Sequence, residues 1–533
     1  MNKYLRPEYV AVLASLLILS VILLFKPLIG MANNGDFERI MTSASLSYAT
    51  DDREEKYFNY FISRFPITGE IWTAIPTYLS SQVILVKLAT WISQLFTPGW
   101  LDIRFLALLY MLLLSAAFYC IIRSVPAQYR AVRWTLAIML IVVFADAGYA
   151  AYFNSLFGEP VSLVFLLLLM GFAMAISRQV HQRSVQELQR EEQHSGSQFE
   201  EGQRSDEGGQ VRNSRKSTRT EQRTERAKAK RSERTQWWLL AGFYLAGIFV
   251  VGAKVQNAPV VLILLLIGIR LWGLSPAKLW KAAVVTGSAL LVLTSVAAYT
   301  AINKDIKVIN QFQTVFYGIL KTSETPEEDL RELGLNPDWA VLAGYNYFVP
   351  DMPLDIKDPE FEAELREHIS HSKVALFYLK HPQRFWNILS IAAEHAFTIK
   401  PTYMGNYEKE EGQSPGALSH AFTLYSKAKL HLLPKSMALI IVSYLVFGLI
   451  WISEYVKKRS RARRLALEMI MGVAIIGLIQ LVVPVIGDGL ADLEKHLFMF
   501  NVTWDMMTVA VAAWIVHTLV ERRKRINKLL NSA

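Results

Sequence analysis

The sequence contains a single cysteine, Cys120, among its 533 residues. An intramolecular disulfide is therefore impossible, and no metal site built from several thiolates can form. Internal repeats are also missing, which disfavours a transporter made of repeated halves. The formal net charge is +10, and most of the basic excess lies in short loops beside apolar runs. This distribution favours a membrane surface over nucleic acid as the partner.

Long apolar runs, by contrast, recur from one end of the chain to the other. Hydrophobic residues make up 52% of the sequence, and the mean hydropathy is +0.25. A run of about 18 or more apolar residues predicts a membrane-spanning helix. The first run is too long for a signal-peptide core and lacks a clear cleavage site, so we expect a retained anchor. The ten predicted spans are 9–30, 104–122, 134–152, 160–177, 237–253, 257–273, 282–301, 436–454, 466–486 and 497–519.

The distribution of lysine and arginine determines the predicted orientation. Segment 71–97 is apolar in bulk but carries Gln82, Lys87 and Gln94. If this segment does not cross the membrane and the N-terminus is cytoplasmic, every strongly basic short loop falls on the cytoplasmic side, as the positive-inside rule requires. We therefore predict that 71–97 forms one or two helices on the outer leaflet, and that both chain termini are cytoplasmic.

The chain is predicted to divide into five parts. Segment 178–235 is rich in Arg, Lys, Glu, Gln and Ser, and we expect a disordered basic cytoplasmic loop. Segment 302–435 is the largest outer region, and we expect short helices packed on the membrane surface. The other parts are a first membrane half (1–177) with a catalytic outer loop (31–101), central transmembrane helices (236–301), and C-terminal transmembrane helices with a basic cytoplasmic tail (436–533).

Unusual polar residues gather in four predicted outer turns. These turns follow the first and third spans and connect the fifth span to the sixth and the ninth to the tenth. Ionisable groups at the membrane edge are costly and usually functional. The candidate site residues are Asn34, Asp36, Glu38, Arg39, Asn154, Glu159, Lys254, Gln256, Asn257, Asp488, Asp492, Lys495 and His496.

The charged groups among them also have structural interpretations. Asp36 can cap a helix, Glu159 suits the dipole of a helix start, and Lys254 can extend its ammonium group to the interface. The combination favours chemistry, because two separate carboxylate sites face two separate cation sites. We predict that Lys254, Lys495 and His496 bind a donor phosphate. A carboxylate, Asp36 or Glu159, then takes the proton of an acceptor hydroxyl.

These roles describe glycosyl transfer from a lipid-phosphate sugar at the outer face, where cytoplasmic nucleotide sugars are lacking. The segments NNGDFERI, FNSLFGEP, GAKVQNAP and GDGLADLEKHLFMFN resemble the GT-C class of polytopic glycosyltransferases, in particular the WsfD-like hexose transferases of bacterial surface-layer glycan assembly. The resemblance covers most of the chain except 178–235. It implies an all-α membrane bundle, a polyprenyl-phosphate sugar donor, a glycan or lipid-linked acceptor, and inversion with Asp36 as the base and Glu159 lining the site.

Three questions stay open at this point. Some proteins of the GT-C class bind a divalent metal through paired acidic residues, and Asp36 with Glu38 imitates such a pair only weakly, so the sequence leaves the metal undecided. A flippase or transporter of lipid-linked glycans is an alternative, but it should carry charges near mid-membrane. An envelope glycan polymerase or acyltransferase would share the outer location, and only its activity would separate it from a glycosyltransferase.

Overall fold

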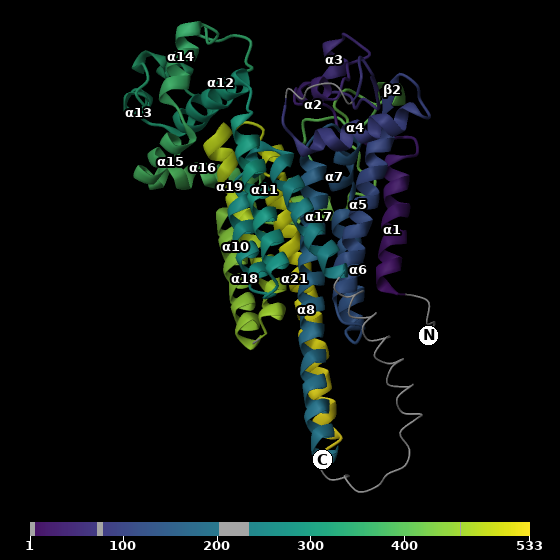
Figure 1. Ribbon diagram of the computed structural model, residues 1–533. Coiled ribbons are helices and arrows are strands. Elements are labelled where there is room, and N and C mark those ends of the chain that lie inside the picture. Colours follow the sequence, from purple (N-terminus) through teal and green to yellow (C-terminus); the bar gives the residue numbers. More distant parts are fainter. Residues whose placement is uncertain (1–5, 72–77, 202–233, 459, 533) are drawn as a thin grey trace.

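The computed structural model describes residues 6–71, 78–201, 234–458 and 460–532, and most of them are helical (Figure 1). Within this part of the chain, seven helices are long and apolar enough to cross a membrane, one bent pair adds an eighth, and two shorter apolar helices make ten. The protein is an all-α integral membrane protein, as predicted. The bundle helices are α1 (Pro7–Leu23), α5 (Ile103–Ser124), α6 (Arg130–Phe144) with α7 (Ala147–Ala150) and η1 (Ala151–Asn154), α8 (Glu159–Glu201), Arg234–Ala253, α10 (Val260–Trp272), α11 (Lys278–Thr300), α18 (Met437–Lys457), α19 (Arg461–Asp488) and α21 (Phe498–Leu530).

The first helix is shorter than its apolar run. We predicted a span over 9–30, whereas α1 ends at Leu23. Pro27 explains the difference, because proline lacks a backbone N–H and disfavours helical geometry in the residue before it. The rest of the run continues as irregular chain into the first loop, and its Leu28 and Ile29 are buried.

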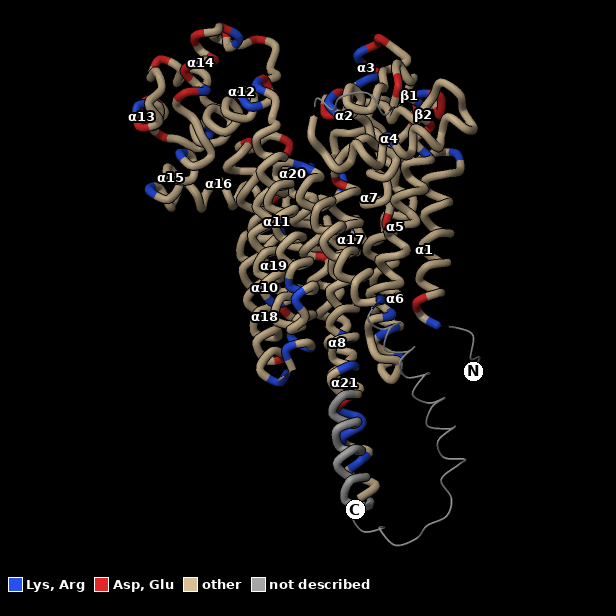
Figure 2. The backbone as a smooth tube through the Cα atoms, viewed as in Figure 1, with Lys and Arg blue, Asp and Glu red and all other residues tan. Residues whose placement is uncertain are grey.

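The two ends of the bundle differ in charge (Figure 2). One end carries acidic and basic residues together, and we term it the loop end. The opposite end is rich in lysine and arginine with few acidic residues, and we term it the basic end. The loop end comprises residues 31–71, 78–101 and 302–423, and the basic end comprises 123–133, 178–186, 270–281, 457–458 and 460–464.

Helix α8 is longer than the predicted span. Residues 178–201 are not disordered but continue α8 from its membrane-spanning part. The segment is rich in Gln, Glu and Arg, which have high helix propensity, and it contains no proline, so a helix that is already nucleated can propagate through it. The remainder of the predicted loop, 202–233, lies outside the described residues.

One helix of the loop end lies across the bundle rather than along it. This helix is α4 (Ser81–Gln94), the described helix of the predicted 71–97 segment. At its start, the hydroxyl of Ser80 donates to the carbonyl of Ala253 (2.8 Å), at the end of one bundle helix. Near its other end, the Ser93 hydroxyl accepts from the Asp102 amide (2.9 Å), where α5 begins. Both ends thus meet the same end of the bundle, as expected for a membrane-parallel helix.

The first loop has little other regular structure. Strands β1 (Arg64–Pro66) and β2 (Trp100–Asp102) pair antiparallel, with Phe65 opposite Leu101. This pairing fixes the start of α5 against the loop. The two remaining short helices of the loop are α2 (Phe37–Ser43) and α3 (Arg53–Lys56).

The second loop region consists of short helices. Several of them share a hydrophobic core with α18, α19 and α21, in which the rings of Trp339 and Phe361 lie 4.2 Å apart. Figure 1 shows α12, α13 and α14 projecting beyond the bundle. The elements are α12 (Lys304–Phe312), η3 (Gln313–Ile319), η4 (Leu320–Thr322), α13 (Pro326–Glu332), η5 (Pro337–Leu342), α14 (Pro359–His368), α15 (His371–Lys380), α16 (Pro382–His395), η6 (Lys409–Glu411) and α17 (Leu424–Leu432).

Helix α17 differs from its neighbours because it enters the bundle. The ammonium group of Lys429 on α17 lies 2.6 Å from a carboxylate oxygen of Asp505 on α21, and both side chains are buried. The hydroxyls of Tyr149 and Tyr425 donate to the same carboxylate at 2.5 and 2.6 Å. Two hydroxyl donors and one cation therefore satisfy this carboxylate, and the cluster fixes α17 between α7 and α21.

Candidate active site

A turn held by Asn33 places Asp36 at the loop end. The amide oxygen of Asn33 accepts from the backbone N–H groups of Gly35 (2.8 Å) and Phe37 (3.1 Å), and Gly35 has φ 106°, a conformation that suits glycine. Asp36 stands at the N-cap position of α2 but makes no side-chain capping bond. The capping interpretation of Asp36 is therefore wrong, and its carboxylate is directed elsewhere.

The carboxylate of Asp36 lies between two cations. It forms ion pairs with Arg39, one turn further along α2, and with Lys495 of the short helix α20 (Leu493–His496). Lys495 is buried, whereas Asp36 is about a quarter exposed, at 27%. A long-range contact thus joins the turn after α1 to the turn before α21, although 459 positions separate them.

Asp492 provides a second acidic group beside Lys495. Its carboxylate lies 3.7 Å from the Lys495 ammonium, and it accepts from the Asn34 amide (2.6 Å) and from the Tyr403 hydroxyl (3.2 Å). Asp492 has φ 47°, in the left-handed region that aspartate tolerates better than most residues. Such backbone strain is often found where a site must be held in one geometry. Burial and then the charge of Asp492 raise the pKa of Tyr403 well above its ordinary value.

Glu159 and Lys254 form the other pair. Glu159 is the first residue of α8, and one of its oxygens lies 2.6 Å from the Lys254 ammonium. The second oxygen of Glu159 is buried without a hydrogen-bond partner among the described residues. The backbones are close here, because a Cβ atom added to Gly158 would lie 2.9 Å from the Ala253 carbonyl. Lys254 therefore turns toward a buried carboxylate instead of extending to the interface.

The two ion-pair groups lie near each other. The ammonium of Lys495 sits 5.0 Å above the ring of Phe157, two positions before Glu159. Burial lowers the pKa of Lys495, and the negative charges of Asp492 and Glu159 oppose that shift. We term the combined group the carboxylate–lysine site. Its members are Asn34, Asp36, Arg39, Glu159, Lys254, Asp492 and Lys495.

His496 lies next to this site, in surroundings that disfavour its charged form. Burial lowers its pKa well below the ordinary value, and the positive charges of Lys254, Lys495 and Arg39 lower it further. The predicted role of His496 as a phosphate ligand stays a prediction, and this environment favours the neutral form of the imidazole. Its Nε2 lies 3.1 Å from a carboxylate oxygen of Asp488, so the neutral ring can still share one hydrogen bond there.

Gln256 connects the two turns. Its amide donates to the backbone carbonyl of His496 (2.7 Å) and to the side chain of Gln480 on α19 (2.9 Å). These bonds fix the turn before α10 against the turn before α21. Gln256 thus positions the lysines of both turns, and in this arrangement its amide is already occupied.

Glu38 was predicted to line the site, and it faces away from Asp36. Its carboxylate accepts from the hydroxyls of Tyr57 (2.7 Å) and Tyr48 (3.1 Å). Burial, with the bond to Glu38, raises the pKa of Tyr57 to about 12. Asp36 and Glu38 therefore do not converge on one point. Among the described residues, no group of three or more His, Cys, Asp or Glu side chains is placed to hold a metal ion.

Two predicted lining residues have structural roles. The buried amide of Asn154 donates to the backbone carbonyls of Leu23 and Ile29, at 3.0 and 2.9 Å. The buried amide of Asn257 donates to the Val250 carbonyl (2.8 Å) and to a serine hydroxyl on α8. Each amide group thus binds backbone carbonyl groups of neighbouring segments, and the prediction that these residues also line the substrate stays a prediction.

Sequence reasoning missed the tyrosines of the site. Tyr403 comes from the second loop region, in an irregular segment without periodicity, and only the fold brings it to Asp492. Tyr78 lies under the Arg39 guanidinium, 5.4 Å from ring centre to carbon. The one available signal was the density of tyrosine in the first loop, where Tyr48, Tyr57 and Tyr60 follow the NNGD turn.

Comparison with known proteins identifies a family for nearly the whole chain. Residues 1–189 and 226–531 match the model of the YfdI N-terminal transmembrane domain. Neither the search of curated proteins nor the search of solved structures gave a match. The YfdI family is related to glycosyltransferases, which supports a membrane glycosyltransferase. Because the match spans far more than half of the residues, the chain belongs to the family of the YfdI N-terminal transmembrane domain.

Proposed function

We propose that the protein transfers a hexose from a polyprenyl-phosphate donor to a cell-surface glycan or lipid-linked acceptor. The observation that carries this proposal is the ion-paired triplet of Asp36, Arg39 and Lys495 beside the Glu159–Lys254 pair. A lipid-phosphate donor needs cations at membrane depth for its phosphate, and an acceptor hydroxyl needs a nearby base. The carboxylate–lysine site supplies both.

We propose that the loop end faces the outside of the cell and that both termini are cytoplasmic. The basic end carries the excess of lysine and arginine, which the positive-inside rule associates with the cytoplasm. The site would then be extracytoplasmic, where a sugar donor must be attached to a lipid. This orientation is consistent with a membrane-parallel helix α4 on the outer leaflet.

The ion pairs suggest how donor binding prepares the base. Without donor, Lys495 and Arg39 occupy the Asp36 carboxylate. The phosphate diester of the donor would attract the same cations, with charge-assisted bonds that are strong in a dry site. As Lys495 turns toward the phosphate, Asp36 becomes available to an acceptor hydroxyl. Donor binding and base activation would therefore be coupled through one lysine.

The reaction itself is a single displacement with inversion. Asp36 takes the proton from the acceptor hydroxyl, and the acceptor oxygen forms a bond to the anomeric carbon. The bond from that carbon to the phosphate oxygen breaks, and polyprenyl phosphate leaves with the electron pair. Lys495 and Lys254 stabilise the added charge on the leaving phosphate. Glu159 is the second candidate for the base, because one of its oxygens has no hydrogen-bond partner in the described residues.

The proposal is tested with purified protein in proteoliposomes. Polyprenyl-phosphate hexoses, each with a radiolabelled sugar, are supplied with lipid-linked glycans extracted from the source cells. Transfer of label to the glycan fraction supports the function, and movement of intact lipid-linked glycan across the bilayer without transfer supports a flippase instead. Addition of a chelator tests whether transfer requires a metal ion. Because Asp36 and Glu38 do not converge, we expect transfer to persist. The hexose class of the sugar and a surface-layer acceptor stay predictions.

A further inference from the structure

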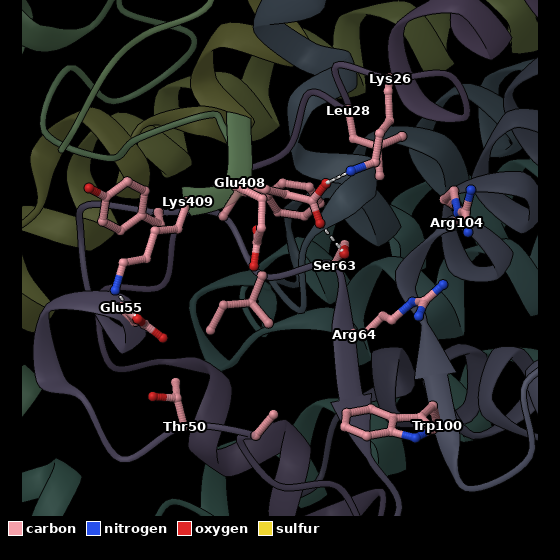
Figure 3. A pocket seen from close by; sticks show the side chains of 15 residues that line it. Lys26, Leu28, Thr50, Glu55, Ser63, Arg64, Trp100, Arg104, Glu408 and Lys409 are labelled. Atoms are coloured by element: carbon pink, nitrogen blue, oxygen red, sulfur yellow. Dashed lines mark hydrogen bonds and ion pairs between the residues drawn. The ribbon is translucent and has the colours of Figure 1, made fainter. Parts of the chain in front are cut away.

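A cavity of about 530 Å³ opens at the loop end, apart from the carboxylate–lysine site (Figure 3). The first loop, the start of α5 and the segment around η6 line it. Binding sites for small ligands commonly have volumes of about 300–1,000 Å³. The residues that matter here are Lys26, Tyr60, Ser63, Arg64, Trp100 and Glu408.

Glu408 is the strongest sign that this cavity binds a ligand. Glu408 as a whole residue is 8% exposed, and one of its carboxylate oxygens accepts a hydrogen bond from the Ser63 hydroxyl. The other oxygen is buried without a hydrogen-bond partner, and the nearest cation, the ammonium of Lys26, lies 3.7 Å away. In Figure 3 the carboxylate lies between Ser63 and Lys26. A buried acceptor left unsatisfied is costly, so a ligand hydroxyl would bind well there.

The charges around the cavity are mostly paired with one another. Arg104 holds the Asp102 carboxylate with two bonds, at 2.9 and 2.5 Å, and Arg64 lies 3.7 Å from the same group. Lys409 is paired with Glu55. Lys26 is likewise paired with Glu408 and Glu411, so among the described lining residues no cation is left free for a phosphate or a uronic acid. A neutral ligand rich in hydroxyl groups fits this balance better than an anion.

Trp100 adds an apolar surface to this polar set. It lies on β2 at the cavity edge and is 39% exposed. A half-exposed indole ring offers a flat face for the C–H groups of a sugar ring, while the neighbouring carboxylate and arginines meet its hydroxyls. Tryptophan is also common at membrane interfaces, where its ring lies at the level of the lipid headgroups. The experiment must therefore separate saccharide binding from contact with lipid.

Two chain segments connect the cavity to the surroundings of the carboxylate–lysine site. Segment 57–60 carries Tyr57, which binds Glu38, and three residues later Tyr60, which lines the cavity. Three extended residues span at most about 10 Å. Segment 403–408 likewise carries Tyr403, which binds Asp492, and then Glu408. Segment 403–408 thus contacts Asp492 at one end and lines the cavity at the other.

We propose that this cavity is the acceptor subsite and binds a neutral saccharide unit of the acceptor glycan. That the bound saccharide belongs to the acceptor rests on the proposed function, whereas saccharide binding itself is argued from the cavity alone. Glu408 accepts from sugar hydroxyls, Trp100 packs on one ring face, and Arg64 donates to ring or hydroxyl oxygens. The saccharide presents its terminal hydroxyl toward Asp36.

Binding is measured first without any donor. Protein in nanodiscs is applied to an array of neutral oligosaccharides built from hexoses and N-acetylhexosamines, together with anionic oligosaccharides of matched length. We expect retention of neutral members, weakened about tenfold or more by Glu408→Gln and by Trp100→Ala. Trp91→Ala is the matched control, because Trp91 is 48% exposed on α4 outside the cavity, and it should bind normally. Trp100→Phe, which keeps an aromatic ring at this position, should retain most of the wild-type binding.

Three outcomes would overturn the proposal. These are retention of anionic members only, retention of no member, and retention that Glu408→Gln and Trp100→Ala leave unchanged. Equal losses in Trp91→Ala would assign the effect to the membrane interface. The proposed function fails separately: if Asp36→Asn and Glu159→Gln both keep full transfer, the mechanism is wrong, yet array binding that depends on Glu408 would still establish the saccharide site.

Discussion

Replacing Lys254 by methionine should destabilise the protein more than replacing Lys254 and Glu159 together. The two charges lie 2.6 Å apart, and Glu159 is 2% exposed. Coulomb's law gives an attraction of about 6 kcal/mol at that distance with an effective dielectric constant of about 20. Burial of both groups offsets much of this attraction. Removing only the lysine, however, leaves an uncompensated buried carboxylate, which costs about 3–5 kcal/mol.

The assay is a double-mutant cycle on Lys254→Met, Glu159→Gln and the double variant. Unfolding midpoints in detergent and in nanodiscs rank the four proteins, and a coupling of about 0.5–3 kcal/mol is typical of contacting residues. Lys254→Met should have the lowest midpoint, and the double variant should recover part of the loss. Lys304→Met, at an exposed position on α12, is the control. Strictly additive losses would refute the idea that these residues form one coupled pair.

The remaining predictions use other parts of the molecule. In a cysteine-free background, a cysteine at Asp52 should react with an impermeant thiol reagent in intact cells and one at Lys457 should not; the reverse pattern would invert the proposed orientation. Because the folded pKa of His496 is depressed, the unfolded chain binds more protons below about pH 6.5, so stability should fall as pH drops below that value. His496→Asn should flatten this fall in unfolding midpoints, and an unchanged slope would contradict the assignment. Lys429→Met should lower stability by about 3–5 kcal/mol by leaving Asp505 buried without a cation, and an unchanged midpoint would show that the pair is not needed.

Much of the bundle was predictable because membrane helices are determined by local sequence. Each of the ten predicted spans coincides with an apolar helix or bent helix pair of the described chain, seven of them long enough by themselves to cross a membrane. The mixed polarity of 71–97 predicted one or two helices on the outer leaflet, and the described part of this segment forms α4 at the loop end. The errors came from effects that hydropathy does not capture. Pro27 ended α1 early, and helix propensity extended α8 through a polar segment where composition predicted disorder.

The site was predictable only in part. Positions at the ends of spans predicted that Asp36, Glu159, Lys254 and Lys495 would converge, and the structure joins them in two ion pairs. Their partners depend on contacts between turns hundreds of residues apart, which one sequence does not reveal. The lowered pKa of His496 likewise follows from burial, from its neighbour Lys495, and from the cations Lys254 and Arg39 on two other turns. The roles of the asparagines were the least predictable, because asparagine can cap a helix, donate hydrogen bonds to backbone carbonyl groups or bind substrate.

The position of α17 inside the bundle was not predicted, for a related reason. Its sequence, LYSKAKLHL, is not apolar enough to suggest a position inside the bundle. The helix is stable there because Lys429 and Tyr425 meet the Asp505 carboxylate. A polar helix can thus be buried when each polar group has a specific partner, and composition alone does not predict that.

The central claim is that a carboxylate of this site removes the proton from the acceptor. The most direct measurement is the initial rate of hexose transfer from polyprenyl-phosphate hexose in proteoliposomes, compared between wild type, Asp36→Asn, Glu159→Gln and the exposed-loop control Glu54→Gln. We predict that Asp36→Asn lowers the rate by about 10²–10⁴-fold while the protein stays folded and Glu54→Gln keeps the wild-type rate. A wild-type rate in Asp36→Asn with an inactive Glu159→Gln would move the base to Glu159, and wild-type rates in both would contradict the account.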